Sequence, residues 1–370
     1  EPWRWMPRTE QIWTMGDRPP LMAVVNSILA FFTLNNKSWS FHTYQVIGTF
    51  LNTLFLLPLV PLLMRLFRNR QVAFLAAVAV FINIFIFLNT YYTWPKLLGV
   101  FFVLASLEFA FTHPSKLLTA SVGGLLWGFG ALSHEGVLLS LPLPLFTWLI
   151  WLWRGFGQSA PSHTYPGAFS HVKHLLAILG YLATFLVLFT LLQAPWIWFK
   201  KSHPDIDSNN LVYHYLPTED PDHIGHTRQN HLKELKLFLE STSLDEQISH
   251  RKNNLKLFQV SDFRIAIQGW LCGDFESDLK NIYVRKFFYP VSAIGEFQLL
   301  LALLAITLAV LGTLVKVRTR LIASKPKWGL LALFIFCSSL SYLFNVLAKW
   351  TPSFNHELPY AELVIFSAIV

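Results

Sequence analysis

Residues 15–34 read MGDRPPLMAVVNSILAFFTL, in which an acid and an arginine precede two prolines and an apolar run. Proline suits the first turn of a helix, because no hydrogen bond within the helix is lost there. The run at 21–34 is therefore predicted to be a helix, but it is shorter than the ~20 residues that cross a bilayer. We expect it to lie along a membrane interface, with Asp17 in the turn ahead of it.

The apolar character of this run continues through the chain. Of 370 residues, 54% are hydrophobic and 14% are charged, against roughly 25% charged in soluble proteins. The predicted fold is all-α: a polytopic transmembrane helix bundle with a juxtamembrane helix at 21–34. Spans are predicted at 44–67, 72–88, 97–111, 117–132, 137–153, 175–196, 297–315 and 328–347.

The composition changes abruptly between residues 200 and 290, where charged and polar residues dominate and 241–245 is predicted to be a turn or helix cap. We expect three regions. Residues 1–199 form an N-terminal transmembrane region with the first extracytoplasmic loop, 200–290 a soluble extracytoplasmic insert, and 291–370 truncated C-terminal transmembrane helices. The chain starts without methionine and stops inside an apolar run, so we expect a fragment of a longer protein.

Alternating spans sort the polar residues onto two sides. Short loops on one side carry basic residues, which marks that side as cytoplasmic and explains the net charge of +8 without a nucleic-acid partner. These are Arg65, Arg68, Arg70, Lys116, Arg154, Lys173, Lys316, Arg318, Arg320, Lys325 and Lys327. The opposite side gathers the candidate site residues: Asp17, Arg18, Trp94, Lys96, His134, Glu135, His356 and Glu357.

Asp17 and Arg18 each allow two interpretations. Asp17 either caps the turn before the helix or acts as a general base that deprotonates an acceptor hydroxyl. An inverting sugar transfer needs one such base, opposite the leaving group. Arg18 either steers a phosphate or extends to lipid headgroups.

Lys96 follows Trp94 and Pro95 where a span enters the membrane. It is either an interfacial anchor or a cation that neutralises a lipid phosphate as it leaves. His134 and Glu135 lie in a hairpin between two apolar runs. Ionisable residues at membrane depth indicate function, unless the hairpin lies near the surface and is exposed to water. A neutral or protonated His134 would then hydrogen-bond a phosphate and Glu135 would orient it.

Two further groups have simpler explanations. The spacing of His223, His226 and His231 matches no strong metal pattern, so a solvated surface explains them better than zinc ligation. Glu108 lies near the cytoplasmic end of its span, where it is expected to extend to the membrane surface or to pair with a neighbouring helix. No metal site is predicted.

At 17–21, DRPPL, the chain resembles the GT-C superfamily of polyprenyl-phosphate-sugar-dependent glycosyltransferases. The closer likeness is to the bacterial branch of lipid A aminoarabinose transferase and the protein O-mannosyltransferases. In that family an acid of the first extracytoplasmic loop precedes Pro-Pro-Leu, an interface helix and an inward span ending in arginines. WGFGALSHEG at 127–136, with Leu-Pro at 141–142, resembles the family's hairpin, and His134 stands where better-known members have lysine.

Two weaker elements complete the likeness, which covers about residues 12–153 well and the remainder only by topology. NHELP at 355–359 resembles a basic-aromatic-x-x-Pro stretch, and TWPKLL at 93–98 with the histidine hairpin resembles a less characterised bacterial subgroup. Family members usually place a second acid where this chain has Lys96. That departure suggests a metal-independent site in which cations hold the lipid phosphate, so no cofactor is expected.

The resemblance implies a multi-pass protein of the bacterial plasma membrane. It would transfer a hexose or pentose, with inversion, from a polyprenyl-phosphate donor to a lipid, glycan or protein acceptor at the extracytoplasmic face. Asp17 would be the base, while Lys96, His134 and Arg18 would bind the donor phosphate. Glu135, Trp94, His356 and Glu357 would orient these cations or the sugar. The alternative is a transporter or flippase, or an assembly protein, for lipid-linked sugars; the sequence shows no internal repeat of the kind transporters carry.

Overall fold

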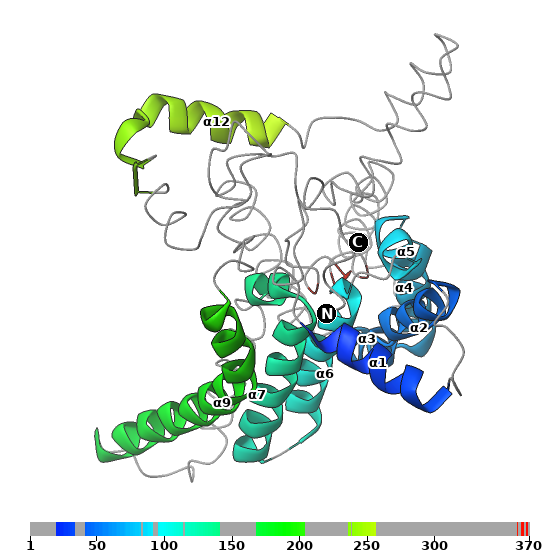
Figure 1. Cartoon of the computed structure of the whole chain (residues 1–370). Helices are drawn as coiled ribbons and strands as arrows, with labels where there is room; N and C mark the ends of the chain where they lie inside the picture. The colour runs from blue at the N-terminus through cyan, green and yellow to red at the C-terminus, as the bar shows by residue number, and fades with distance from the viewer. Residues whose placement is uncertain are drawn as a thin grey trace, which may run out of the picture.

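The computed structural model describes residues 20–33, 41–82, 84–91, 95–113, 115–140, 168–203, 236–237 and 239–256, with 361, 364–365 and 368 near the C-terminus. Every element of this part is helical, which confirms the all-α class (Figure 1). The elements are α1 (Leu21–Thr33), α2 (Phe41–Thr53), α3 (Leu56–Phe67), α4 (Arg70–Ile82), α5 (Ile84–Tyr91), α6 (Lys96–Thr112), α7 (Lys116–Ser133), the 3-10 helix η4 (Glu135–Ser140), α9 (Ala168–Ser202) and α12 (Leu244–Lys256).

Two of the described helices are long and apolar enough to cross a membrane, judged by length and composition. They are Gln45–Phe67, which joins α2 and α3, and Leu175–Ser202 within α9. These segments coincide with the predicted spans at 44–67 and 175–196. The apolar helix Arg70–Phe81 is shorter. The predicted spans at 297–315 and 328–347 lie outside the described residues.

The first predicted span is interrupted. A turn at Leu54 and Phe55 separates α2 from α3. Pro58 has no amide hydrogen for the carbonyl of Leu54, and the amide of Leu57 donates to that carbonyl instead, at 3.0 Å. Proline therefore imposes a tighter local turn on an otherwise continuous apolar run.

Boundaries in the second half of the described part also differ from the prediction. The predicted helix at 137–153 begins as the 3-10 helix η4, and residues 141–153 lie outside the described part. α9 begins at Ala168, so His171, Lys173 and His174 belong to this helix and not to the predicted polar loop. At its other end α9 continues to Ser202, across the boundary predicted at 199/200.

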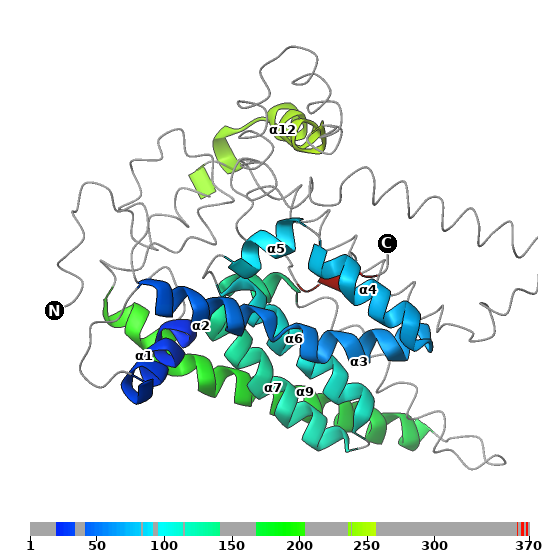
Figure 2. The ribbon, with the colours of Figure 1, turned by 90° about the vertical axis from the view of Figure 1, so that its right-hand side faces the viewer.

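The helix directions agree with the predicted alternation. Trp127 of α7 donates its Nε1 hydrogen to Ser106 Oγ of α6 at 3.1 Å, and Ala120 packs against Ala110, so α6 and α7 are antiparallel. α7 and α9 are parallel, because Gly124 and Gly128 lie against Phe185 and Leu192 in the same order. Figure 2 shows these three helices side by side, with α2 and α3 running along them.

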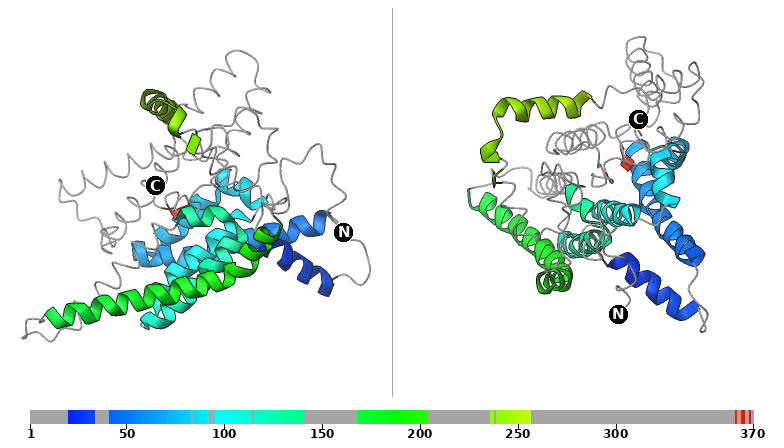
Figure 3. Two further views of the ribbon diagram at one scale, coloured as in Figure 1. Left: turned by 60° about the vertical axis from the view of Figure 1, so that its left-hand side comes forward. Right: turned by 45° about the horizontal axis from the view of Figure 1, so that its top comes forward.

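Leucine, valine and aromatic side chains of α3, α6 and α7 form the main core, with Leu59, Leu63, Leu104 and Trp127 at most 1% exposed. α9 is different, because many of its large apolar side chains are exposed. They are Leu175, Leu176, Leu179, Leu186, Val187, Leu191, Ile197, Trp198 and Phe199. Such a face is unusual in water and typical of a helix in lipid. In the views of Figure 3 the charged helix α12 lies apart from the apolar helices.

Candidate functional site

Three helix ends meet at one end of the structure. Because α6 is antiparallel to α7, and α7 is parallel to α9, the start of α6 lies beside the ends of α7 and α9. A Cβ atom added at Gly99, in the first turn of α6, would lie 3.7 Å from the Cβ of His134. Lys200, in the last turn of α9, contacts Glu135. We call this region the Lys96 end; it brings together three of the predicted site residues, Lys96, His134 and Glu135.

Lys96 is the first residue of α6, after Pro95, and its side chain is 2% exposed. A lysine is rarely buried so completely without anionic or polar partners. Its position adds to the cost, since the amino end of a helix carries partial positive charge. Both factors favour an anionic or polar group close to the ammonium of Lys96.

His134 follows the last residue of α7 in an extended conformation, with φ −156° and ψ 128°. Its Nδ1 accepts a hydrogen bond from the backbone N–H of Gly136 at 3.0 Å. A backbone amide only donates, so Nδ1 is unprotonated in this geometry and the ring proton of the neutral imidazole is on Nε2. Of the two predicted forms of His134, the structure fits the neutral one, with Nε2–H as a donor.

Glu135 forms an ion pair with Lys200 that the sequence analysis did not anticipate. Lys200 Nζ lies 2.8 Å from Glu135 Oε1, and the two side chains are 14% and 18% exposed. Lys200 Nζ also lies 5.5 Å from the centre of the Trp196 ring. One feature of the sequence could have indicated this ion pair: Lys200 follows an apolar run that is predicted to end on the same side as Glu135. What sequence does not give is the parallel register of α7 and α9.

A buried polar pair lies between α2 and α5. Asn52 donates from Nδ2 to the carbonyl of Asn89 at 3.1 Å, and both side chains are fully buried. Thr90, 4% exposed, donates to the carbonyl of Ile86 within α5. These contacts fix the end of α5 just ahead of the segment that leads to Lys96. The hydrogen bond from Asn52 links α2 to the carboxyl end of α5.

α1 also begins at this end. Met22, 4% exposed, packs with Leu51 of α2 and Leu98 of α6. Asp17 and Arg18 precede α1 in the sequence and lie outside the described residues, as do Trp94, His356 and Glu357. The three insert histidines, His223, His226 and His231, are outside them as well. Within the described part, no group of three His, Cys, Asp or Glu side chains is placed to hold a metal ion.

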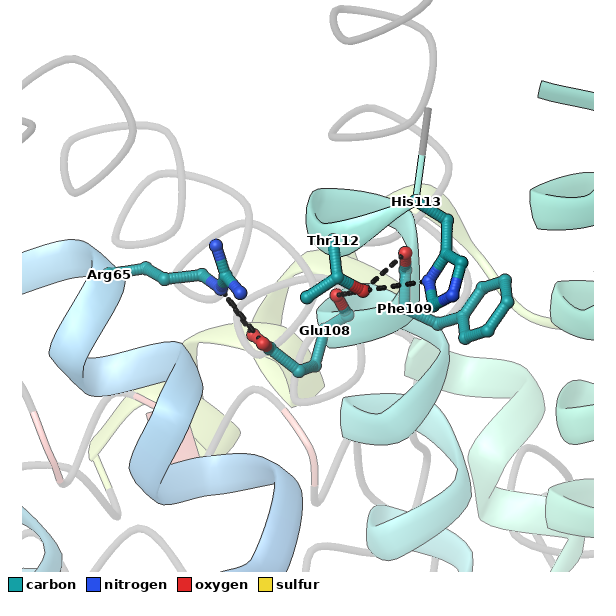
Figure 4. A network of polar contacts seen from close by, with 5 residues as sticks. All are labelled: Arg65, Glu108, Phe109, Thr112 and His113. Atoms are coloured by element: carbon teal, nitrogen blue, oxygen red, sulfur yellow. Dashed lines mark hydrogen bonds and ion pairs between the residues drawn. The ribbon is translucent and has the colours of Figure 1, made fainter. Parts of the chain in front are cut away.

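The opposite end carries a second polar cluster (Figure 4). Arg65 Nε of α3 lies 2.8 and 3.0 Å from the two carboxylate oxygens of Glu108 on α6. Of the two expectations for Glu108, this contact confirms the second, that Glu108 pairs with a neighbouring helix. Beside it, the ring of His113 stacks on Phe109 with centroids 3.7 Å apart. The cluster joins α3 and α6 at the end predicted to be cytoplasmic.

No family model matches the chain, and no match was found among curated proteins or solved structures. The resemblance to the GT-C superfamily therefore rests on the sequence motifs alone.

Proposed function

We propose that the chain is a multi-pass glycosyltransferase of the bacterial plasma membrane that uses a polyprenyl-phosphate sugar donor. The observation that carries this proposal is the meeting of Lys96, His134 and the Glu135–Lys200 pair, from three helices, at one end of an apolar structure. Charged groups grouped at the edge of apolar helices suit a ligand with a charged head and a long lipid tail. The DRPPL motif supplies the acid that sugar transfer requires.

In the proposed reaction an acceptor hydroxyl attacks the anomeric carbon of the donor sugar. Asp17 takes the hydroxyl proton as the new C–O bond forms, and the bond between the anomeric carbon and the phosphate oxygen breaks. Attack from the face opposite the phosphate inverts the configuration. The polyprenyl phosphate leaves with the bonding electron pair. Lys96, Nε2–H of His134 and Arg18 stabilise its negative charge, and preset donors are effective because they need no reorganisation.

The test replaces Asp17 by asparagine, which keeps the shape of the side chain and removes its basicity. Sugar transfer from radiolabelled polyprenyl-phosphate sugars is measured in vesicles containing the wild type or Asp17→Asn. Glu10→Gln serves as a control from the same N-terminal stretch. We expect transfer by the wild type and Glu10→Gln, and a loss of at least about 10²-fold in Asp17→Asn, as is typical for removal of a general base. Unchanged transfer by a well-folded Asp17→Asn chain would remove Asp17 from the mechanism.

A further inference from the structure

We propose that Lys200 is a positioning residue that sets the phosphate-binding geometry of His134 through Glu135. This inference rests on the proposed function and deepens it, because it explains how a histidine at the end of α7 is held ready for an anion. Lys200 belongs to α9, far along the sequence from the other members of the Lys96 end. It reaches the site only because α7 and α9 are parallel.

The ion pair between Lys200 and Glu135 is stronger than an ion pair on an exposed surface. The two charged groups are 2.8 Å apart, and both side chains are less than one-fifth exposed. Exposed ion pairs contribute little because water screens them and their side chains are free to move. Partial burial strengthens the attraction, and the Trp196 ring beneath Lys200 Nζ further restricts the lysine. The pair is therefore suited to fix the position of the Glu135 side chain.

The packing of α9 on α7 makes Lys200 a fixed reference point. Gln193, 7% exposed, donates from Nε2 to the carbonyl of Gly128 at 2.7 Å. At Gly124 the helices are so close that an added Cβ would lie 2.5 Å from the carbonyl oxygen of Phe185. A helix anchored twice along its length holds its last turn in register, which places Lys200 beside Glu135.

Glu135 lies between His134 and Gly136, which are joined by a hydrogen bond within one turn. Gly136 donates its N–H to Nδ1 of His134 at 3.0 Å, and the amide of Val137 donates to the carbonyl of His134 at 3.1 Å. Because Glu135 belongs to this tight turn, its ion pair with Lys200 attaches the turn to the last turn of α9. While the turn is clamped, Nδ1 stays an acceptor and the proton stays on Nε2, where it can be donated to a phosphate oxygen.

The experiment compares full-length chains in lipid nanodiscs, chiefly the wild type, Lys200→Met, Lys200→Arg and Lys201→Met. Methionine keeps the apolar stem and removes the charge, arginine restores the charge, and Lys201 is a matched exposed lysine at the next position of α9. The first readout is the ¹⁵N NMR signature of the His134 tautomer, assigned by its disappearance in His134→Gln. The second is the KM for the polyprenyl-phosphate sugar, separated from kcat.

We expect the wild type, Lys200→Arg and Lys201→Met to show His134 protonated on Nε2. In Lys200→Met this signature should give way to a mixture of tautomers, and the donor KM should rise by roughly tenfold, equivalent to ~1.4 kcal/mol of donor binding. Adding Glu135→Gln to Lys200→Met should cause little further loss, because the two side chains act as one unit.

An unchanged His134 signature and an unchanged donor KM in Lys200→Met would overturn the role of Lys200. An equal effect of Lys201→Met would do the same, since a general loss of charge on α9 would then explain the result. A wild-type chain that transfers no sugar would instead contradict the proposed function. The tautomer readout does not depend on transfer, so the two failures are distinguishable.

Discussion

At the residue scale, the amino end of α12 shows how a local motif in the polar insert determines structure. Ser243 Oγ accepts from the amide of Glu246 at 3.3 Å. In return Glu246 Oε2 accepts from the Ser243 amide and hydroxyl, both at 2.9 Å. This reciprocal arrangement is a capping box, which satisfies amide groups that a helix start leaves without partners. It confirms the predicted cap at 241–245, because the motif is a matter of local spacing.

The capping box predicts a pH dependence of α12. The hydrogen bond from the Ser243 backbone, followed by that from its hydroxyl, lowers the pKa of Glu246. A carboxyl group with a lowered pKa in the folded state stabilises the helix above its unfolded pKa, about 4.3. This stabilisation is lost as the pH falls through the lower, folded value. Hydrogen-exchange protection of α12, corrected for intrinsic rates, should therefore be greater in the wild type than in Glu246→Ala at pH 7. The two chains should converge at low pH; an equal difference at both pH values would contradict the capping role.

At the element scale, the contact between α7 and α9 depends on small residues. α7 presents Gly124 and Gly128 to α9, and the side chain of Phe185 packs against the cluster around Trp127. Trp127 in turn is held by its hydrogen bond to Ser106 of α6. The three helices therefore form one unit, in which the spacing of α7 from α9 sets the position of Lys200 relative to Glu135.

Two glycine substitutions test this spacing. In Gly124→Ala the new methyl group would meet the backbone oxygen of Phe185 at 2.5 Å, which a side-chain rotation cannot relieve. We expect a loss of about 1–3 kcal/mol of stability, the usual cost of overpacking. Gly180→Ala is the control, since nothing lies within 4 Å of the added carbon. Alanine there should be neutral or stabilising by up to ~1 kcal/mol. Denaturant unfolding in detergent measures both; equal stabilities would contradict the close approach of the two helices.

The elements also show what sequence can and cannot predict. Apolar runs bounded by polar residues predicted α6 and α7 almost to the residue, because composition and length dominate there. The turn at Leu54 was missed although Pro58 signals it, and the start of α9 was missed because His171, Lys173 and His174 do not break a helix. Lys96, His134 and Glu135 were predicted to share one end from alternation alone. Lys200 falls on the same predicted side, but its ion pair with Glu135 was not predicted, since that contact depends on the register between two helices.

At the scale of the whole molecule, the described helices α3, α6, α7 and α9 carry charged groups at two ends and exposed apolar side chains between them. Arg65 and Glu108 pair at one end, while Lys96, His134, Glu135 and Lys200 gather at the other. The exposed apolar face of α9 connects the two. This distribution suits a molecule whose middle contacts lipid tails. For the proposed function, the polyprenyl chain would remain in the lipid while its phosphate reaches the charged groups of the Lys96 end.

The most direct test of this account is whether the donor phosphate binds at the Lys96 end. Native mass spectrometry measures the binding of a polyprenyl-phosphate sugar to the wild type, Lys96→Met and Lys116→Met in matched detergent. Methionine has a volume similar to that of lysine and is well tolerated in a buried position. Lys116, at the start of α7, lies at the Arg65 end. We expect Lys96→Met to weaken donor binding at least about tenfold, the effect of losing ~1.4 kcal/mol, and Lys116→Met to bind the donor like the wild type. Equal donor binding by all three folded chains would contradict it.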